Sequence, residues 1–183
     1  MEIKHITTPL TQEKVKDLKS GDSVLISGTI YTGRDAAHQR LVDAINNGEA
    51  LPFDPKDSII YYVGPAPAKP GKPIGSAGPT TSYRMDDLTV PLLDLGLTGM
   101  IGKGARNQTV IDSMKKNGAI YFAAIGGAGA LIANTIKECE IIAFEDLGPE
   151  AVRKLTVVDF PAVVVIDTKG NNLYETERKK YQK

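Results

Sequence analysis

The sequence contains one cysteine, two histidines and no tryptophan. A disulfide needs two cysteines, so Cys139 cannot form one within the chain, and a lone thiol is typical of proteins in a reducing cytoplasm. The chain also lacks the four thiolates of an iron–sulfur cluster and the four cysteine or histidine ligands of a usual structural zinc site. We therefore predict that this chain by itself holds no metal.

An excess of charge and a long hydrophobic segment are also missing. Lys and Arg number 22, as do Asp and Glu, so the formal net charge is zero. A neutral chain creates no field that would attract nucleic acid or an anionic membrane. No apolar run approaches the length of a membrane span, and the first residues show no signal stretch. We expect a cytoplasmic protein without a nucleic-acid or membrane partner.

The 183 residues suit one domain, residues 1–183, and alternating strand and helix patterns predict an α/β layered fold with a mixed sheet. Strands are expected at residues 3–8, 22–31, 59–63, 97–101, 119–125, 140–144 and 162–166. Helices are expected at residues 11–18, 35–46, 85–95, 108–116, 127–136 and 150–154. The Pro- and Gly-rich residues 64–73 fit either a domain linker or an extended functional loop, and the strand-like segments on both sides favour the loop. The chain after residue 171 is expected to form a final strand or tail.

The run Gly78-Pro79-Thr80-Thr81-Ser82-Tyr83-Arg84-Met85-Asp86 places three hydroxyls and a guanidinium in one turn. Gly and Pro favour a tight loop, and one of the hydroxyls is expected to cap a helix beginning near Tyr83. Free backbone N–H groups and Arg84 would then form a site for a carboxylate or phosphate. An ordinary capped helix start with a surface arginine fits this run equally well.

Two more cationic side chains follow predicted strands. Arg34 begins a helix, where the helix dipole disfavours a cation, and such a broken local rule indicates function. Lys103 lies between two glycines that would let a ligand approach the backbone, although the spacing is not that of a P-loop. A simple ion pair for Arg34 and an exposed turn for Lys103 remain open, and His38 alone is best interpreted as a packing residue.

Residues 126–131, Gly-Gly-Ala-Gly-Ala-Leu, follow a strand and open a helix, as in a dinucleotide-binding fingerprint. Ile132 stands where the third glycine would be, and the unit comes late in the chain. Close packing of the helix is the better interpretation.

Several motifs, in order, resemble one family. They are Ser27-Gly28 through Arg34-Asp35-Ala36-Ala37-His38, Tyr62-Val63-Gly64-Pro65, residues 78–86 and Gly102-Lys103-Gly104. Over nearly the whole chain they closely resemble the β subunit of class I fumarate hydratase, an iron–sulfur-dependent hydro-lyase, and the tartrate dehydratase β subunit looks similar. The resemblance implies a swivelling β/β/α three-layer domain.

The same resemblance implies reversible hydration of fumarate to (S)-malate in an active site shared with a larger α subunit. That partner would carry three cysteines and a [4Fe–4S] cluster, in an assembly such as α₂β₂. One iron with an open position would act on the substrate as a Lewis acid.

Site residues are carried over from the resemblance one by one. Arg34 and Arg84 would bind substrate carboxylates, Lys103 would lie at the same pocket, and Thr80 would be the base. A weakly basic hydroxyl in that role needs cationic neighbours such as Arg84 and Lys103. Residues behind these would orient them: Asp35, His38, Thr81 and Ser82.

Two alternatives stay open. Arg34, Arg84 and Lys103 would suit any four-carbon dicarboxylate, so tartrate is the alternative substrate. A different class is a non-catalytic module that binds a carboxylate or nucleotide without a partner.

Overall fold

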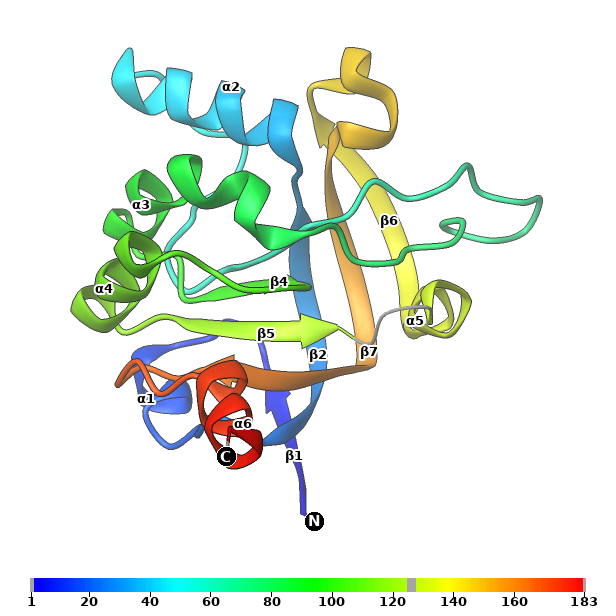
Figure 1. Ribbon diagram of the computed structural model, residues 1–183. Helices are drawn as coiled ribbons and strands as arrows, with labels where there is room; N and C mark the ends of the chain where they lie inside the picture. Colours follow the sequence, from blue (N-terminus) through cyan, green and yellow to red (C-terminus); the bar gives the residue numbers. More distant parts are fainter. Residues whose placement is uncertain (1, 125–127, 183) are drawn as a thin grey trace.

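A computed structural model describes residues 2–124 and 128–182 of the chain (Figure 1). The strands are β1 (Ile3–Thr7), β2 (Ser23–Thr32), β3 (Ile59–Tyr61), β4 (Gly99–Gly102), β5 (Ile120–Ala124), β6 (Ile136–Ala143) and β7 (Val152–Ile166). The α-helices are α1 (Gln12–Val15), α2 (Asp35–Asn46), α3 (Asp86–Asp94), α4 (Gln108–Asn117), α5 (Gly129–Thr135) and α6 (Leu173–Tyr181). Two 3₁₀ segments, η1 (Ser82–Met85) and η2 (Glu145–Glu150), precede α3 and β7.

The seven strands form one mixed sheet that folds back on itself. Its order is β1-β2-β3-β4-β5-β7-β6, and β2 also pairs with β7. β1 to β5 are parallel neighbours, whereas β7 runs antiparallel to β2, β5 and β6. In Figure 1, β4 and β5 cross in front of the upright β2 and β7. The helices α3 and α4 lie at the left of the picture, with α2 above them. The mixed α/β fold is confirmed, and its layers are strand, strand and helix.

Alternation along the central strands divides the core in two. In the apolar run 59–63, Ile59, Tyr61 and Val63 pack in the core between the strand layers. Ile60 and Tyr62 face the helices α2 to α4. Successive strand side chains point to opposite faces, so a strand buried on both sides reads as a continuous apolar run.

The carboxyl ends of the parallel strands lie at one edge, where α2 and α4 begin. β2 leads into α2, and β4 leads into the loop before α4. Asn107 caps α4 by accepting a hydrogen bond from the Val110 N–H, and Gly118 ends it in the left-handed conformation (φ 68°). Ligands of open α/β sheets bind at this kind of edge.

The Pro- and Gly-rich segment is a loop of this sheet, as predicted, and not a linker between units. It connects β3 to η1 and stands out to the right of the body in Figure 1. Its two arms meet where the Ala66 N–H donates to the Ser76 carbonyl at 2.9 Å. Gly75 is required there, because an added Cβ would lie 2.4 Å from the Ala66 carbonyl oxygen.

Three local predictions were wrong. The predicted helix at 150–154 is instead the end of η2 and the start of β7, in which Val152 packs in the core on the helix side, and Leu155 and Val157 pack in the core between the strand layers. The chain after residue 171 forms the helix α6, capped by the Asn172 side chain on the Tyr174 N–H, instead of a strand or tail. β6 begins at Ile136, four residues before the predicted strand. In each case tertiary pairing or a local cap prevailed over a weak pattern.

Among the described residues, no helix combines the length and the apolar character that crossing a membrane would take.

Candidate functional site

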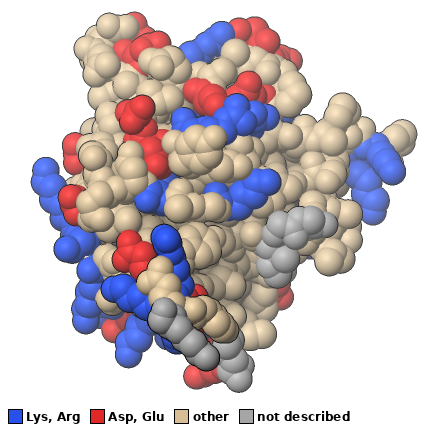
Figure 2. Space-filling view, in the orientation of Figure 1, with Lys and Arg blue, Asp and Glu red and all other residues tan. Residues whose placement is uncertain are grey.

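Arg84 and Arg34 meet at one carboxylate at the start of α2. Both Nε and Nη2 of Arg84 lie 2.9 Å from Asp35 Oδ2. Arg34 Nε lies 3.8 Å from Asp35 Oδ1. The structure thus brings together the two arginines that the sequence predicted, although they are 50 residues apart in the chain. Figure 2 shows Lys or Arg side chains against Asp or Glu side chains over this region.

Arg34 also faces an acid that the sequence analysis missed. Its Nε lies 3.9 Å from Glu150 Oε1, at the end of η2. Arg34 Nε and Asp35 Oδ1 are buried, and neither has a hydrogen-bond partner within residues 2–124 and 128–182. The Arg34 side chain passes over Gly64, where an added Cβ would lie 2.9 Å from Nη1. This close approach explains the glycine in the Tyr-Val-Gly-Pro motif.

Thr80 and Lys103 lie on two loops that are joined by their backbones. The Lys103 N–H donates to the Thr80 carbonyl at 3.3 Å, and the Ser82 N–H donates to the Lys103 carbonyl at 2.8 Å. Thr81 and Lys103 form an isolated parallel bridge. The Thr80 N–H donates to the Tyr62 carbonyl at 2.7 Å, which extends the sheet edge to this loop. The Lys103 side chain is exposed.

The predicted helix cap in this turn was wrong. Neither η1 nor α3 has a side-chain hydrogen bond at its start, and η1 is a 3₁₀ segment. The Ser82 hydroxyl is buried and bonds instead to the Tyr121 hydroxyl at 2.8 Å, which donates to the Gly104 carbonyl at 2.7 Å. An added Cβ at Gly102 would lie 2.0 Å from Ser82 Oγ. Ser82 therefore holds the two loops together.

His38 is a buried neighbour of Arg34. Its Nδ1 donates to the Arg34 carbonyl at 2.9 Å, and its ring stands edge-on to Tyr62 at 5.3 Å between centroids. Burial lowers the pKa of His38 to about 4, so the ring is neutral at pH 7. This position agrees with the packing interpretation and also lets His38 fix the backbone of Arg34.

Arg106, which was not among the predicted site residues, lies in the loop between β4 and α4 and contacts α3. Its buried guanidinium donates to Asp86 Oδ1 at 2.6 Å, to the Tyr62 hydroxyl at 3.1 Å and to Thr89 Oγ1 at 3.0 Å. Burial opposes the charge, but Tyr62 and Asp86 together keep the pKa of Arg106 above its usual value. No local pattern singles it out, because its partners Asp86, Tyr62 and Thr89 lie 17 to 44 residues away in the chain.

The glycine-rich motif at 126–131 falls partly outside the described residues, which omit 125–127. In the described part, an added Cβ at Gly129 would lie 2.4 Å from Ser76 Oγ. The Ala77 N–H donates to the Gly129 carbonyl at 3.2 Å. The close packing predicted for this helix is therefore observed at Gly129.

The described residues offer no group of three or more His, Cys, Asp or Glu side chains that could hold a metal ion. Cys139 lies on β6, where burial raises the pKa of its thiol. As a single thiol it cannot supply the several thiolate ligands that a cluster would take.

The fold and these side chains define a class, three-layer α/β domains with cationic groups gathered at the carboxyl edge of parallel strands. The chain belongs to the family described as Fumarase C-terminus, whose profile matches residues 2–177. The family resemblance drawn from the motifs is thereby confirmed.

Named relatives agree with the family. A Methanocaldococcus jannaschii protein named "Putative L(+)-tartrate dehydratase subunit beta" is 41% identical over 181 residues, 95% of this chain and 93% of that protein. "Fumarate hydratase class I, aerobic" of Escherichia coli K12 is 42% identical over 175 residues, 94% of this chain. "Fumarate hydratase 2" of Leishmania major is 41% identical over 165 residues. The chain spans 31% of the length of the E. coli protein and 29% of the L. major protein.

Proposed function

We propose that this chain is the β subunit of a [4Fe–4S]-dependent hydro-lyase that hydrates fumarate to (S)-malate reversibly. The observation that carries the proposal is the pair Arg34 and Arg84 meeting at Asp35, in a chain of the Fumarase C-terminus family. Relatives named fumarate hydratase match nearly the whole chain, which supports the reaction type.

In this proposal the arginines bind the substrate carboxylates. A guanidinium offers two parallel N–H donors that match a carboxylate, and two arginines would orient a dicarboxylate from both ends. Asp35 holds Arg84 before substrate binds, with both contacts at 2.9 Å to a single oxygen. Arg34 Nε is buried, but the side chain as a whole is 25% exposed, so its terminal nitrogens are the donors proposed for a substrate carboxylate.

Thr80 is proposed to move the proton. In dehydration its Oγ1 would take the proton from the carbon next to a carboxylate, the C–H electrons would form the double bond, and the hydroxyl of the adjacent carbon would leave with its bonding pair. In hydration Thr80 would return that proton to carbon. Its joined neighbour Lys103 would supply positive charge that stabilises the deprotonated oxygen.

The cluster is proposed to belong to a partner, because the described part of this chain offers no ligand set for it. The name "subunit beta" of the M. jannaschii relative supports a partner subunit. When bound, the cluster would supply a Lewis acid for the leaving hydroxyl. An α₂β₂ assembly is the proposed form.

The test is an anaerobic pull-down of the tagged chain from native lysate, followed by an assay for loss of fumarate absorbance in the eluate. Activity together with a brown, cysteine-bearing partner is expected. A colourless eluate that leaves both fumarate and tartrate unchanged would overturn the proposal.

Tartrate is the second candidate substrate. It is favoured by the M. jannaschii relative, because the chain covers 93% of that protein and about a third or less of the fumarate hydratases. Turnover of fumarate and tartrate by the same anaerobic preparation separates the two candidates.

A further inference from the structure

We infer that Glu150 is a positioning residue that holds Arg34 for the substrate carboxylate. The inference rests on the proposed function, since it assigns Glu150 a part in the same site. The Glu150 carboxylate makes two contacts there. It accepts a hydrogen bond at the start of α2, and it faces the guanidinium of Arg34.

The start of α2 lacks a cap of its own. Arg34 occupies the N-cap position, and an arginine side chain has no hydrogen-bond acceptor. Glu150 Oε1 takes that place by accepting from the Ala36 N–H at 3.3 Å. The same oxygen lies 3.9 Å from Arg34 Nε. One carboxylate therefore anchors the helix start and the side chain that leaves it.

Asp35 is shared between the two arginines. Its Oδ2 accepts both contacts from Arg84, and its Oδ1 lies 3.8 Å from Arg34 Nε. Among the described residues, Asp35 and Glu150 are the acids within ion-pair distance of Arg34. On its other side, the Arg34 side chain lies against Gly64, where an added Cβ would be 2.9 Å from Nη1. Glu150 is thus the acid near Arg34 that is not also bound by Arg84.

The distance leaves Arg34 available to a ligand. Since the Arg34 Nε donor bonds to neither acid, the two charges orient the guanidinium without using that N–H group. Nε itself is buried, and the side chain is 25% exposed. An incoming carboxylate would meet the exposed part of a guanidinium that is already fixed, which lowers the entropic cost of binding.

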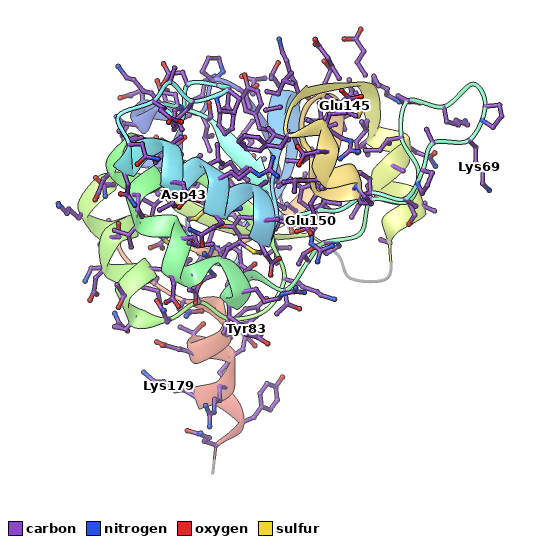
Figure 3. All side chains as sticks on the ribbon, turned by 90° about the horizontal axis from the view of Figure 1, so that it is seen from above. Asp43, Lys69, Tyr83, Glu145, Glu150 and Lys179 are labelled. Atoms are coloured by element: carbon purple, nitrogen blue, oxygen red, sulfur yellow. The ribbon has the colours of Figure 1, made fainter. Side chains whose placement is uncertain are left out.

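η2 itself is held in place on two sides. Arg40 of α2 bonds to Asp146 through both terminal nitrogens. From β7, Arg153 donates to the carbonyls of Gly148 and Pro149 at 3.1 and 2.9 Å. Figure 3 shows Glu150 beside the start of α2 and Glu145 farther along the same segment. The segment therefore presents Glu150 at a defined position.

Glu150→Gln separates the hydrogen bond to the Ala36 N–H from the charge that faces Arg34, and Glu145→Gln is its matched control. Gln keeps an acceptor oxygen for the Ala36 N–H but loses the charge that faces Arg34. Glu145 is an exposed acid of the same segment, so its change alters the net charge equally. In the ¹⁵N-labelled chain, with the Arg34 Nε–H signal assigned through Arg34→Lys, Glu150→Gln should shift that signal and speed its hydrogen exchange. An Arg34 signal that moves no more than in Glu145→Gln would overturn the inference, whether or not the enzyme is active.

In the assembled enzyme, Glu150→Gln should lower kcat/KM about tenfold, mainly through KM, with an unchanged melting temperature. In an Arg34→Ala background the same change should have little further effect, because Glu150 acts through Arg34. An equal loss in both backgrounds, or a loss matched by a fall in melting temperature, would refute the positioning role. An inactive wild-type assembly would instead count against the proposed function, and the Arg34 signal would still decide on Glu150.

Discussion

At the residue scale, the site combines two arginines with one acid that both approach. Arg84 is 44% exposed, yet Asp35 holds its guanidinium before any ligand arrives. These contacts use Nε and Nη2, so Nη1, for which the described residues show no partner, is the nitrogen left for a dicarboxylate.

Arg84→Ala should lower kcat/KM of the assembled enzyme by the equivalent of roughly 2–4 kcal/mol, because a bidentate carboxylate contact is lost. Arg178→Ala is the control, since Arg178 is an exposed arginine of α6. Steady-state kinetics of the anaerobic enzyme measure both. Unchanged kcat/KM for Arg84→Ala would remove Arg84 from the substrate site.

His38 should make stability depend on pH. Burial lowers the pKa of His38 to about 4 in the folded chain, below the usual value of 6.5, so the unfolded chain binds a proton that the folded chain excludes. Its contribution is complete above pH 6.5 and is lost as pH falls toward 4, by about 1.4 kcal/mol per pH unit.

Denaturant unfolding at pH 7, 6 and 5 tests this slope. In His38→Asn the amide replaces the Nδ1 donor to Arg34, and the part of the slope due to His38 should disappear. His5→Asn, a change of an exposed histidine, should leave the slope as in the wild type. Equal slopes in the wild type and His38→Asn would contradict the burial argument.

At the element scale, Arg106 joins α3 to the loop between β4 and α4. Its side chain is fully buried and contacts Asp86, Thr89 and Tyr62. The Asn107 N–H donates to the other oxygen of Asp86 at 2.9 Å. Together with the backbone bonds between the Thr80 and Lys103 loops and the Ser82 hydroxyl, these contacts hold the two loops to each other.

Arg106→Met should destabilise the chain by about 3–5 kcal/mol, because it leaves Asp86 buried and without its partner charge. Arg40→Met, which breaks an exposed pair, should change stability little. Urea unfolding followed by circular dichroism compares the two. Adding Asp86→Leu to Arg106→Met should restore part of the loss, and a small effect of Arg106→Met alone would show that the buried pair is dispensable.

At the scale of the whole molecule, this chain is proposed to supply half of an active site, and the partner subunit the other half. Arg34, Arg84, Thr80 and Lys103 all lie at one edge, and the described residues offer no group of three or more His, Cys, Asp or Glu side chains that could hold a metal ion. A substrate bound to this edge alone would lack the partner's contacts.

The isolated chain should therefore bind fumarate weakly, with a dissociation constant of about 1 mM or higher, near the limit of a few charged contacts. Isothermal titration calorimetry with fumarate, tartrate and NAD measures this. Micromolar binding of any of them by the chain alone would favour the non-catalytic binding module.

The clearest sequence patterns correctly predicted much of the fold. The helices α2, α3 and α4 match their predicted ranges within one residue at each end, because their apolar spacing and end signals agree. The start of β6 was missed, and the start of β7 was predicted as a helix because its buried residues 152, 155 and 157 do not alternate strictly. In α6 a single asparagine cap started a helix. The predicted hydroxyl cap failed because Ser82 had a better partner in Tyr121, 39 residues away.

The sequence by itself determined the family, the mixed α/β class and the cationic residues worth testing, because motifs of glycine, hydroxyl and arginine carry local chemistry. Only the tertiary structure decided which of them meet. Asp35 bridging Arg84 and Arg34, the buried Arg106 pair and the approach of Glu150 all join residues distant in the chain. Such contacts depend on the return of β7 along β2 and on the packing of helices over the sheet, and no local pattern encodes those distances.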